Sequence, residues 1–398
     1  MHIGINGLFY SMPYTGIGQY TVNLVQELSV LVSGKHKITV FINSTNRAEA
    51  LPALPNVDYC TIDKKNRAND LVDILEFEFL LRKTSSRLKI DILHTPYLCS
   101  ALLHGKSFKH IVTVHDVIPR VFTKYRGSLL RQLALWHAER NITKADLIIT
   151  DSVHSQSDIH KFLGIAEDRI NVIQIAADAV FEKNIDETKF DKIRELYSLP
   201  DGYIFYIGGF DYRKNVKVLL EAYADARKKG IKEVLILGGK FNPSEKQLKR
   251  GLAEDISQIA YDLNIQNHIK NLGPIPQDDL PYIYRMARLF VYPSLYEGFG
   301  LPLLEAMNCG TSVLASNSSS IPEIVDRDDL LFDPNDYVKL SEKIQLILAD
   351  DELRHSIGDW GLEKSKDFSW SKAAKQTFDL YKFVAESPVN VNQSIHYE

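Results

Sequence analysis

From Glu297 to Glu305 the chain reads E-G-F-G-L-P-L-L-E: an acid, a Gly-Phe-Gly turn, and a second acid after seven intervening residues. Pro302 suits the first position of a helix and Gly310 the position just past its end, so the pattern predicts a short helix that begins at the turn. The amides and the positive end of such a helix are a natural seat for phosphate. One carboxylate precedes the turn and the other lies one turn inside the helix, where the pair can bind hydroxyls on both sides of a diphosphate. The stretch therefore predicts a site for a sugar nucleotide.

Short β-branched runs alternate with helix-like segments along the whole chain. Such alternation predicts parallel sheets with right-handed crossovers, and two sets of runs predict two doubly wound α/β domains. Neither set has a G-x-G-x-x-G turn after its first strand, so a dinucleotide dehydrogenase would lack its fingerprint. Strands are expected at 3–5, 37–42, 57–62, 90–94, 110–114, 147–150 and 169–173 in the first set, and at 203–207, 233–237, 269–272, 289–292 and 312–315 in the second.

Composition narrows the class of protein. A chain of 398 residues is too long for one ordinary core and fits two domains of roughly 200 residues each. With 45% hydrophobic and 25% charged residues it is globular, and a net charge of −4 gives no long-range attraction to nucleic acid. The three cysteines are scattered, which indicates a reducing compartment. The sequence shows neither a basic leader nor a long apolar run, so we expect a cytoplasmic protein.

The domain boundaries follow from a polar, charge-rich stretch at 176–201. We predict an N-terminal Rossmann-like domain at 1–178, a C-terminal nucleotide-sugar-binding domain at 179–368, and a final segment at 369–398 with a helix at 371–384 and a polar tail. Ligands of open α/β sheets bind at the carboxyl ends of the strands. With two such sheets, a central cleft between the domains is the expected site.

A second motif follows the expected strand 203–207, where the chain reads G-G-F-D-Y-R-K-N. A glycine turn at the end of a strand, followed by Arg213 and Lys214, is a good place to neutralise a leaving diphosphate. Arginine can bind phosphate bidentately, and lysine acts as a point charge. Taken alone, this segment could equally be a basic loop tip.

The acidic stretch, with Pro-Ser at 293–294 before it and Ala-Met at 306–307 after it, resembles the E-x7-E signature of family-4 glycosyltransferases. These are retaining enzymes of the two-domain GT-B fold. The segment with Arg213 and Lys214 is similar to the family's R-K-N phosphate site. Many members carry an earlier arginine directly after the strand-end glycine; here that position is Gly209 or Phe210, which leaves Arg213 to serve. This variant resembles a branch rich in mannosyltransferases of polysaccharide assembly.

The resemblance implies roles for residues in the first half of the chain as well. Gly16, in the T-G-I-G-Q-Y stretch after the first strand, matches a glycine that lies over the donor phosphates. His115, in V-H-D-V-I-P, matches a histidine beside the transferred sugar, where it would position or polarise a hydroxyl. Both motifs also have ordinary structural explanations: a glycine turn before a helix and a hydrogen-bonded histidine at a strand end. In the second half, Ile275 matches the residue whose backbone meets the nucleobase. The resemblance also implies that the helix in 369–398 crosses back to pack on the N-terminal domain.

The resemblance also implies a mechanism. Lys214 and Arg213 would stabilise the departing diphosphate, together with backbone amides of the turn formed by Gly298, Phe299, Gly300 and Leu301. Glu297 would hold hydroxyls of the donor sugar and Glu305 those of the ribose. The proton of the attacking hydroxyl would pass to a phosphate oxygen. We expect no cofactor and no metal, and we interpret the D-x-D at 326–328 as a solvated turn.

The partners are only partly indicated. The donor would be a nucleotide sugar, with GDP-mannose favoured and a UDP-hexose next, and the acceptor a glycan or a lipid-linked sugar. Residues 120–144 combine six basic residues with interleaved leucines and a tryptophan, which is typical either of contact with the inner face of a membrane or of a solvated helix. Two alternatives remain open: a GT-B sugar-nucleotide epimerase and a non-catalytic sugar-nucleotide-binding subunit.

Overall fold

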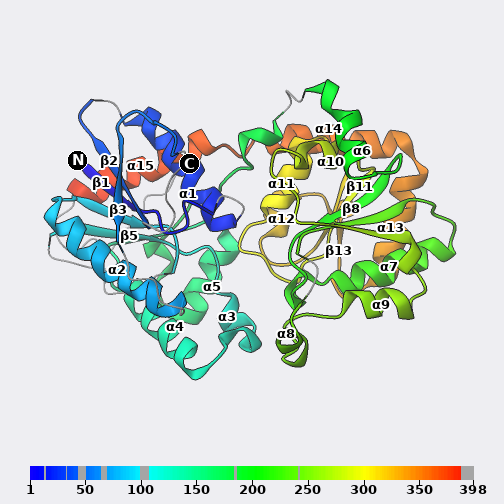
Figure 1. The fold of residues 1–398 in the computed structure, drawn as a ribbon, viewed down its shortest axis with the longest axis horizontal. Coiled ribbons are helices and arrows are strands. Elements are labelled where there is room, and N and C mark those ends of the chain that lie inside the picture. The colour runs from blue at the N-terminus through cyan, green and yellow to red at the C-terminus, as the bar shows by residue number, and fades with distance from the viewer. Residues whose placement is uncertain are drawn as a thin grey trace. The chain divides into compact units, whose positions relative to one another are not determined.

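The computed structural model describes residues 1–12, 15–32, 34–43, 51–63, 70–98, 107–182, 186–240 and 243–386. The polar tail predicted after residue 387 lies outside these ranges. The chain divides into two compact units, which are described separately. Unit 1 comprises Met1–Ile175 with Ser369–Glu398, and unit 2 comprises Ala176–Phe368. Figure 1 shows that each unit is a sheet flanked by helices.

Unit 1 contains a seven-stranded parallel sheet in the order β3-β2-β1-β4-β5-β6-β7. Its strands are β1 (His2–Asn6), β2 (Lys37–Asn43), β3 (Val57–Ile62), β4 (Ile92–Thr95), β5 (Lys109–Thr113), β6 (Leu147–Thr150) and β7 (Ile170–Val172). Its α-helices are α1 (Gly16–Leu31), α2 (Asp70–Arg87), α3 (Ile118–Val121), α4 (Leu129–Ile142), α5 (Val153–Leu163) and α15 (Trp370–Glu386). The last of these packs against α1 (Figure 1).

Unit 2 contains a six-stranded parallel sheet in the order β10-β9-β8-β11-β12-β13. Its strands are β8 (Tyr203–Ile207), β9 (Val234–Gly238), β10 (Ile269–Gly273), β11 (Leu289–Tyr292), β12 (Val313–Ser316) and β13 (Leu331–Phe332). Its α-helices are α6 (Phe190–Leu196), α7 (Val216–Lys228), α8 (Glu245–Lys249), α9 (Ile256–Asp262), α10 (Leu280–Met286), α11 (Leu301–Asn308), α12 (Ile321–Ile324), α13 (Tyr337–Ala349) and α14 (Asp351–Ser365).

Both sheets reverse their strand order once, between β1 and β4 in unit 1 and between β8 and β11 in unit 2. Strands at the centre are buried on both faces and therefore read as continuous apolar runs, as in β8 and β11. Loops leaving the two strands beside a reversal point diverge, and the space between them is where ligands of doubly wound sheets bind. The fold thus indicates two places where a ligand could bind: the carboxyl ends of β1 and β4, and those of β8 and β11.

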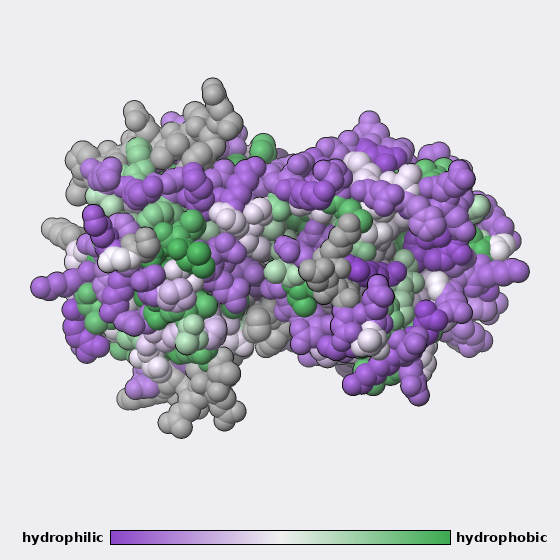
Figure 2. Space-filling model, turned by 90° about the horizontal axis from the view of Figure 1, so that it is seen from above, coloured by the Kyte–Doolittle hydropathy of each residue, from purple (hydrophilic) through white to green (hydrophobic). Residues whose placement is uncertain are grey.

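The strands predicted from the sequence agree with the structure to within two residues at each end. The sequence pattern missed β13, which is only two residues long and pairs in parallel with β12. Such a short strand carries no period-2 signal. Among the described residues, no helix combines the length and apolarity that a membrane span requires. Hydrophilic residues cover most of the face drawn in Figure 2.

The start of α1 contains a glycine that close packing requires. A Cβ atom on Gly18 would lie 1.9 Å from the carbonyl oxygen of Met12. The Gly18 amide donates to Oγ1 of Thr15, the N-cap residue, at 3.1 Å. By contrast, a Cβ on Gly16 would meet no atom within 4 Å. Of the two glycines in this turn, Gly18 therefore has no room for a side chain, whereas Gly16 does.

We expect Gly18→Ala to lower the free energy of unfolding by about 1–3 kcal/mol, because the backbone of residue 12 must move to admit the methyl group. Gly16→Ala is the matched control, because a Cβ at this position has open space. Alanine is more favourable than glycine in a helix by up to about 1 kcal/mol, so this variant should not lose stability. Urea unfolding of both variants measures the difference. Equal stabilities would contradict the packing described for Gly18.

Candidate functional site

Two loops meet at the carboxyl ends of β8 and β11, where the strand order of unit 2 reverses. The first loop turns at Gly208 and continues into the 3₁₀ turn Tyr212–Lys214. The second follows β11 and contains the predicted acid Glu297. A backbone hydrogen bond from the Leu295 amide to the Arg213 carbonyl, at 2.7 Å, joins the two loops. The two sequence motifs that were expected to share a site therefore lie beside one another.

Glu297, Lys214 and Arg213 form the cation–carboxylate cluster of unit 2. The ammonium group of Lys214 donates to Oε1 of Glu297 at 2.6 Å, and Nη1 of Arg213 donates to Oε2 at 2.8 Å. Lys214 and Glu297 are 8% and 7% exposed. Lys214 also donates to the Tyr292 hydroxyl at 3.3 Å, and its Nζ lies 5.3 Å from the centroid of that ring. Because both carboxylate oxygens are engaged, Glu297 fixes the direction of both cations.

The electrostatic surroundings of Glu297 favour its charged form. Burial raises the pKa of Glu297, but Lys214 and Arg213 outweigh it and lower this pKa to about 2. Burial and the neighbouring Arg213 lower the pKa of Lys214, against the opposing effect of Glu297. Asp211 approaches Nε of Arg213 at 3.3 Å. Two carboxylates therefore balance two cations, and an arriving anion would compete with them for the same donors.

The Gly-Phe-Gly turn is held by serines that follow β12. The Glu297 amide donates to Oγ of Ser319 at 2.8 Å, and Oγ of Ser320 donates to the carbonyls of Glu297 and Phe299 at 3.0 and 2.6 Å. Sequence reasoning missed these serines. Their signal is the run of three serines, 318–320, directly after a strand end, where small hydroxyl side chains can reach neighbouring backbone.

Helix α11 begins at the turn, as predicted, but its first residue is Leu301, so Pro302 is the second residue and not the first. Gly300 adopts φ +134°, a conformation that L side chains rarely adopt, so glycine is required where the turn meets the helix. Gly298, the first glycine of the turn, is half-buried. Pro302 lacks an amide hydrogen, and the Leu303 amide bonds to the Gly300 carbonyl at 3.0 Å. The amides that the turn can present to an anion therefore lie at or before Leu301.

Glu305 is buried one turn inside α11, where it is 6% exposed. The Tyr284 hydroxyl of α10 donates to its Oε2 at 2.9 Å. Burial and the adjacent carboxylate raise the pKa of Tyr284 well above its ordinary value, so this hydroxyl stays a donor. Tyr284 was not identified from the sequence, where it is one of 19 tyrosines. Its contact holds Glu305 in one orientation.

Ile275 follows β10 at the same edge of the sheet and is half-buried. Its Cδ1 atom lies 2.9 Å from the place a Cβ would take on Gly238, the last residue of β9. The absence of a side chain at Gly238 thus makes room for Ile275. The side chain of Ile275 therefore lies beside the end of β9, the strand that neighbours β8.

Unit 1 holds the other two predicted residues. Gly16 is exposed at the first position of α1. His115 follows β5: its Nδ1 lies 2.5 Å from Oδ2 of Asp151, and its Nε2 lies 3.1 Å from the Pro96 carbonyl oxygen. Burial lowers the pKa of His115, but Asp151 outweighs it and the net shift is upward. Two acceptors, one facing each ring nitrogen, favour the imidazolium form of His115.

Asp151 was missed by sequence reasoning. It follows β6, and the carboxyl ends of adjacent parallel strands lie side by side, so the strand prediction contained a signal for its meeting with His115. Asp151 is 2% exposed, and its second oxygen, Oδ1, is buried without a hydrogen-bond partner. Such an oxygen raises the free energy of the folded state unless a ligand or water reaches it.

A buried network lies behind His115. The Tyr20 ring of α1 stands edge-on to the His115 ring, with centroids 4.8 Å apart, and its hydroxyl lies 3.0 Å from Oγ1 of Thr113. His94 bridges Thr113 at 2.7 Å and the Tyr381 hydroxyl of α15 at 2.6 Å. Burial and nearby histidines lower the pKa of His94 to about 3, so it is neutral. The C-terminal helix is thereby connected to the surroundings of His115.

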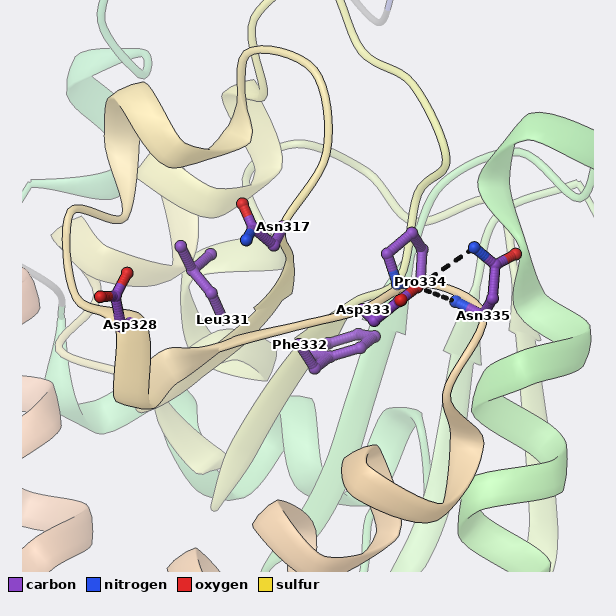
Figure 3. Close-up of a pocket in the computed structure, with 7 residues that line it drawn as sticks. All are labelled: Asn317, Asp328, Leu331, Phe332, Asp333, Pro334 and Asn335. Atoms are coloured by element: carbon purple, nitrogen blue, oxygen red, sulfur yellow. Dashed lines mark hydrogen bonds between the residues drawn. The ribbon is translucent and has the colours of Figure 1, made fainter.

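A separate pocket of about 560 Å³ opens in unit 2 at the ends of β12 and β13 (Figure 3). The loop that forms one wall is tied to the segment of Lys214, because Nδ2 of Asn215 donates to the Pro334 carbonyl at 2.7 Å. The lining includes no residue predicted from the sequence to belong to the site. It consists of Asn317, Asp328, Leu331, Phe332, Asp333, Pro334 and Asn335.

Two residues of the D-x-D sequence at 326–328 form ion pairs. Asp326 pairs with Lys364 at 2.8 Å, and Arg327 pairs with Asp329 at 2.5 Å. Within the ranges that the structure describes, no three His, Cys, Asp or Glu side chains are grouped so that they could hold a metal ion.

Two family models match the chain. Residues 14–179 match "Glycosyltransferase Family 4", and residues 189–363 match "Glycosyl transferases group 1". The O-antigen chain mannosyltransferase B of Escherichia coli is 31% identical over 391 residues, which cover 94% of this chain and 97% of that protein. The serotype-specific mannosyltransferase WbdA of Escherichia coli is 29% identical over 297 residues, which are 73% of this chain but 35% of the longer relative.

Solved structures agree on the fold. Sucrose-phosphate synthase from Thermosynechococcus elongatus superposes with a TM-score of 0.77 at 21% identity, covering 96% of this chain and 99% of the other. HepE of Anabaena, solved in complex with UDP and glucose, gives 0.75 at 18% identity, with 96% and 100% covered. Both predicted features, the pair of Rossmann-like domains and the E-x7-E motif, are thus accounted for by one family. The chain belongs to the family-4 glycosyltransferases and has their GT-B fold.

Proposed function

We propose that this glycosyltransferase is a retaining, metal-independent mannosyltransferase, which moves mannose from GDP-mannose to a glycan or lipid-linked acceptor in polysaccharide assembly in the cytoplasm. The observation that carries the proposal is the buried cation–carboxylate cluster at the reversal point of the unit 2 sheet. The choice of mannose is supported by the names of the relatives, which are mannosyltransferases of O-antigen synthesis.

The chemistry requires stabilisation of the diphosphate as it leaves. Lys214 and Arg213 supply two cations whose positions are fixed before the donor arrives, so the reaction needs little reorganisation of the site. The amides at Phe299 to Leu301 add dipoles on the same side of the sheet. With this positive charge provided by side chains, a divalent metal is not needed to neutralise the diphosphate, which is the basis for proposing metal independence.

Glu297 and Glu305 take the hydroxyls of the donor. Each oxygen of Glu297 accepts a hydrogen bond from a cation, and a carboxylate oxygen can accept a second one from a sugar hydroxyl. Glu305, fixed by Tyr284, is assigned to the ribose, and the backbone at Ile275 to the nucleobase. In unit 1, Gly16 is assigned to the donor phosphates and His115 to the transferred sugar.

His115 does not act as the base in this proposal. Its two nitrogens face Asp151 and the Pro96 carbonyl, so the ring is doubly protonated and has no lone pair with which to accept a proton. The attacking hydroxyl instead gives its proton to an oxygen of the departing diphosphate on the same face of the sugar. Attack from that face is consistent with retention of the anomeric configuration.

We expect Lys214→Ala to lower kcat/KM about 30-fold or more, equivalent to about 2 kcal/mol or more of transition-state stabilisation. Lys217→Ala is the matched control, because this lysine is 48% exposed one turn further along the chain. Melting curves of both variants separate loss of activity from unfolding. Transfer by Lys214→Ala at the unmodified rate would contradict the assignment.

We expect Asp151→Asn to lower the pKa of His115, because the carboxylate is what raises it against burial. A histidine with a raised folded-state pKa contributes stability that is complete below its unfolded pKa of about 6.5 and is lost as pH rises through the folded value. The variant should lose this pH-dependent stability. His94, Asp116 and Tyr20 also surround the ring and are unchanged in it.

The measurement is an NMR titration of the His115 ring, together with unfolding curves at several pH values. Asp168→Asn, on an exposed turn of unit 1, is the control for the substitution itself. An identical His115 titration in the Asp151 variant would show that the pair is not coupled.

The donor and stereochemistry are tested together. We expect GDP-mannose to raise the melting temperature more than UDP-glucose does, because a ligand of the folded state stabilises it by mass action. NMR of the product should show the anomeric configuration of the donor, and a chelator should leave the rate unchanged. An inverted product, or activity abolished by EDTA and restored by Mn²⁺, would refute the corresponding part of the proposal.

A further inference from the structure

Helix α4 exposes large apolar side chains at its start. Leu129, Leu130, Leu133 and Trp136 are 83%, 73%, 54% and 45% exposed. All residues from 129 to 133 are exposed, a stretch longer than one helical turn, so the first turn of α4 faces solvent on every side. Isolated surface leucines are normal, but a cluster of three with a tryptophan marks an interaction surface.

The far half of the same helix is firmly anchored. Ala138 and Ile142 are 2% and 1% exposed, and Ile142 belongs to a core cluster with Val112, Ile148 and Ile159. The start is equally well defined: the Ser128 side chain caps the Arg131 amide. The exposed apolar turns therefore project from a rigid base.

The charged residues of the 120–144 segment are basic with one exception. Glu139, the one acid in the 120–144 segment, is 6% exposed and accepts from Nε of Arg120 at 2.6 Å. This pair removes the negative charge from the surface and one positive charge with it. The segment's remaining charged residues are all cations: Lys124, Arg126, Arg131, Arg140 and Lys144.

Trp136 has the surroundings of an interfacial residue. The guanidinium carbon of Arg140 lies 5.4 Å from the centroid of the Trp136 ring, a cation–π contact that places a cation directly beside an apolar ring. Amphipathic aromatic rings and basic side chains gather at the headgroup level of bilayers, with leucines reaching the acyl chains below.

We propose that the α4 surface, made of Leu129, Leu130, Leu133 and Trp136 with Arg131, Arg140 and Lys144, docks on an anionic lipid bilayer. Charge complementarity selects this occupant: exposed leucines gain by leaving water, and the surrounding cations gain only beside a negatively charged surface. The inference is independent of the donor and acceptor proposed above. Docking would hold unit 1 at a membrane, where lipid-linked acceptors reside.

The test is co-sedimentation of the full chain with vesicles of phosphatidylcholine alone or with 30% phosphatidylglycerol, without substrate. Binding should require phosphatidylglycerol and weaken at high salt. Because each cation near an anionic surface strengthens binding about fivefold, Arg131→Glu with Arg140→Glu should reduce it by at least 25-fold. Leu129→Ser with Leu130→Ser and Leu133→Ser should reduce it comparably.

Matched controls come from exposed positions elsewhere. Val30→Ser removes an apolar side chain that is 74% exposed on α1, and Lys246→Glu with Lys249→Glu reverses two exposed charges on α8. Both should bind vesicles as the unmodified chain does, and melting curves should show that all variants are folded. Failure to bind anionic vesicles, or equal loss in the controls, would overturn the proposal. Leucine-dependent self-association without vesicle binding would instead assign the surface to a second copy of the chain.

Discussion

The buried carboxylate of Glu297 is the constraint on which the candidate site depends. It receives hydrogen bonds from Lys214 and Arg213, which the sequence places more than 80 residues away. Removing one partner from a buried ion pair costs about 3–5 kcal/mol, because the other charge is then left uncompensated in a medium of low dielectric. The strands β8 and β11 must therefore remain neighbours in register, since the loops that carry these charges leave from their carboxyl ends.

This constraint also shapes the chemistry. A cation that waits in a protein interior must be neutralised until its ligand arrives, and Glu297 with Asp211 does so here. The hydrogen bonds fix where the positive charge stands, so little reorganisation is needed during reaction. Unit 1 also pairs a buried carboxylate with a cationic group: Asp151 contacts the ring of His115. The hydrogen-bonded network from Tyr20 to Tyr381 packs behind that ring.

Much of the site could be predicted because its residues lie at strand ends, and strand ends are visible in the sequence. Arg213, Lys214 and Glu297 were recognised from glycine turns after apolar runs, and they converge in the structure. The supporting residues were missed for a physical reason. Asp151, Ser320 and Tyr284 act through contacts across the sheet or between helices, and no local pattern distinguishes them from other polar residues. The two-residue strand β13 was missed because it is too short for periodicity.

The sequence by itself predicted the class of fold, the order of the strands except β13, and the resemblance to the family, because these follow from periodicity, turn residues and the E-x7-E motif. It also placed basic and apolar residues together in 120–144 but left their meaning open. Only the tertiary structure decided that both oxygens of Glu297 are taken by cations, that His115 is held by Asp151, and that the first turn of α4 is exposed on every side. The reason is that a side chain's partners and its exposure depend on segments that are distant in sequence and meet only when the sheets are formed.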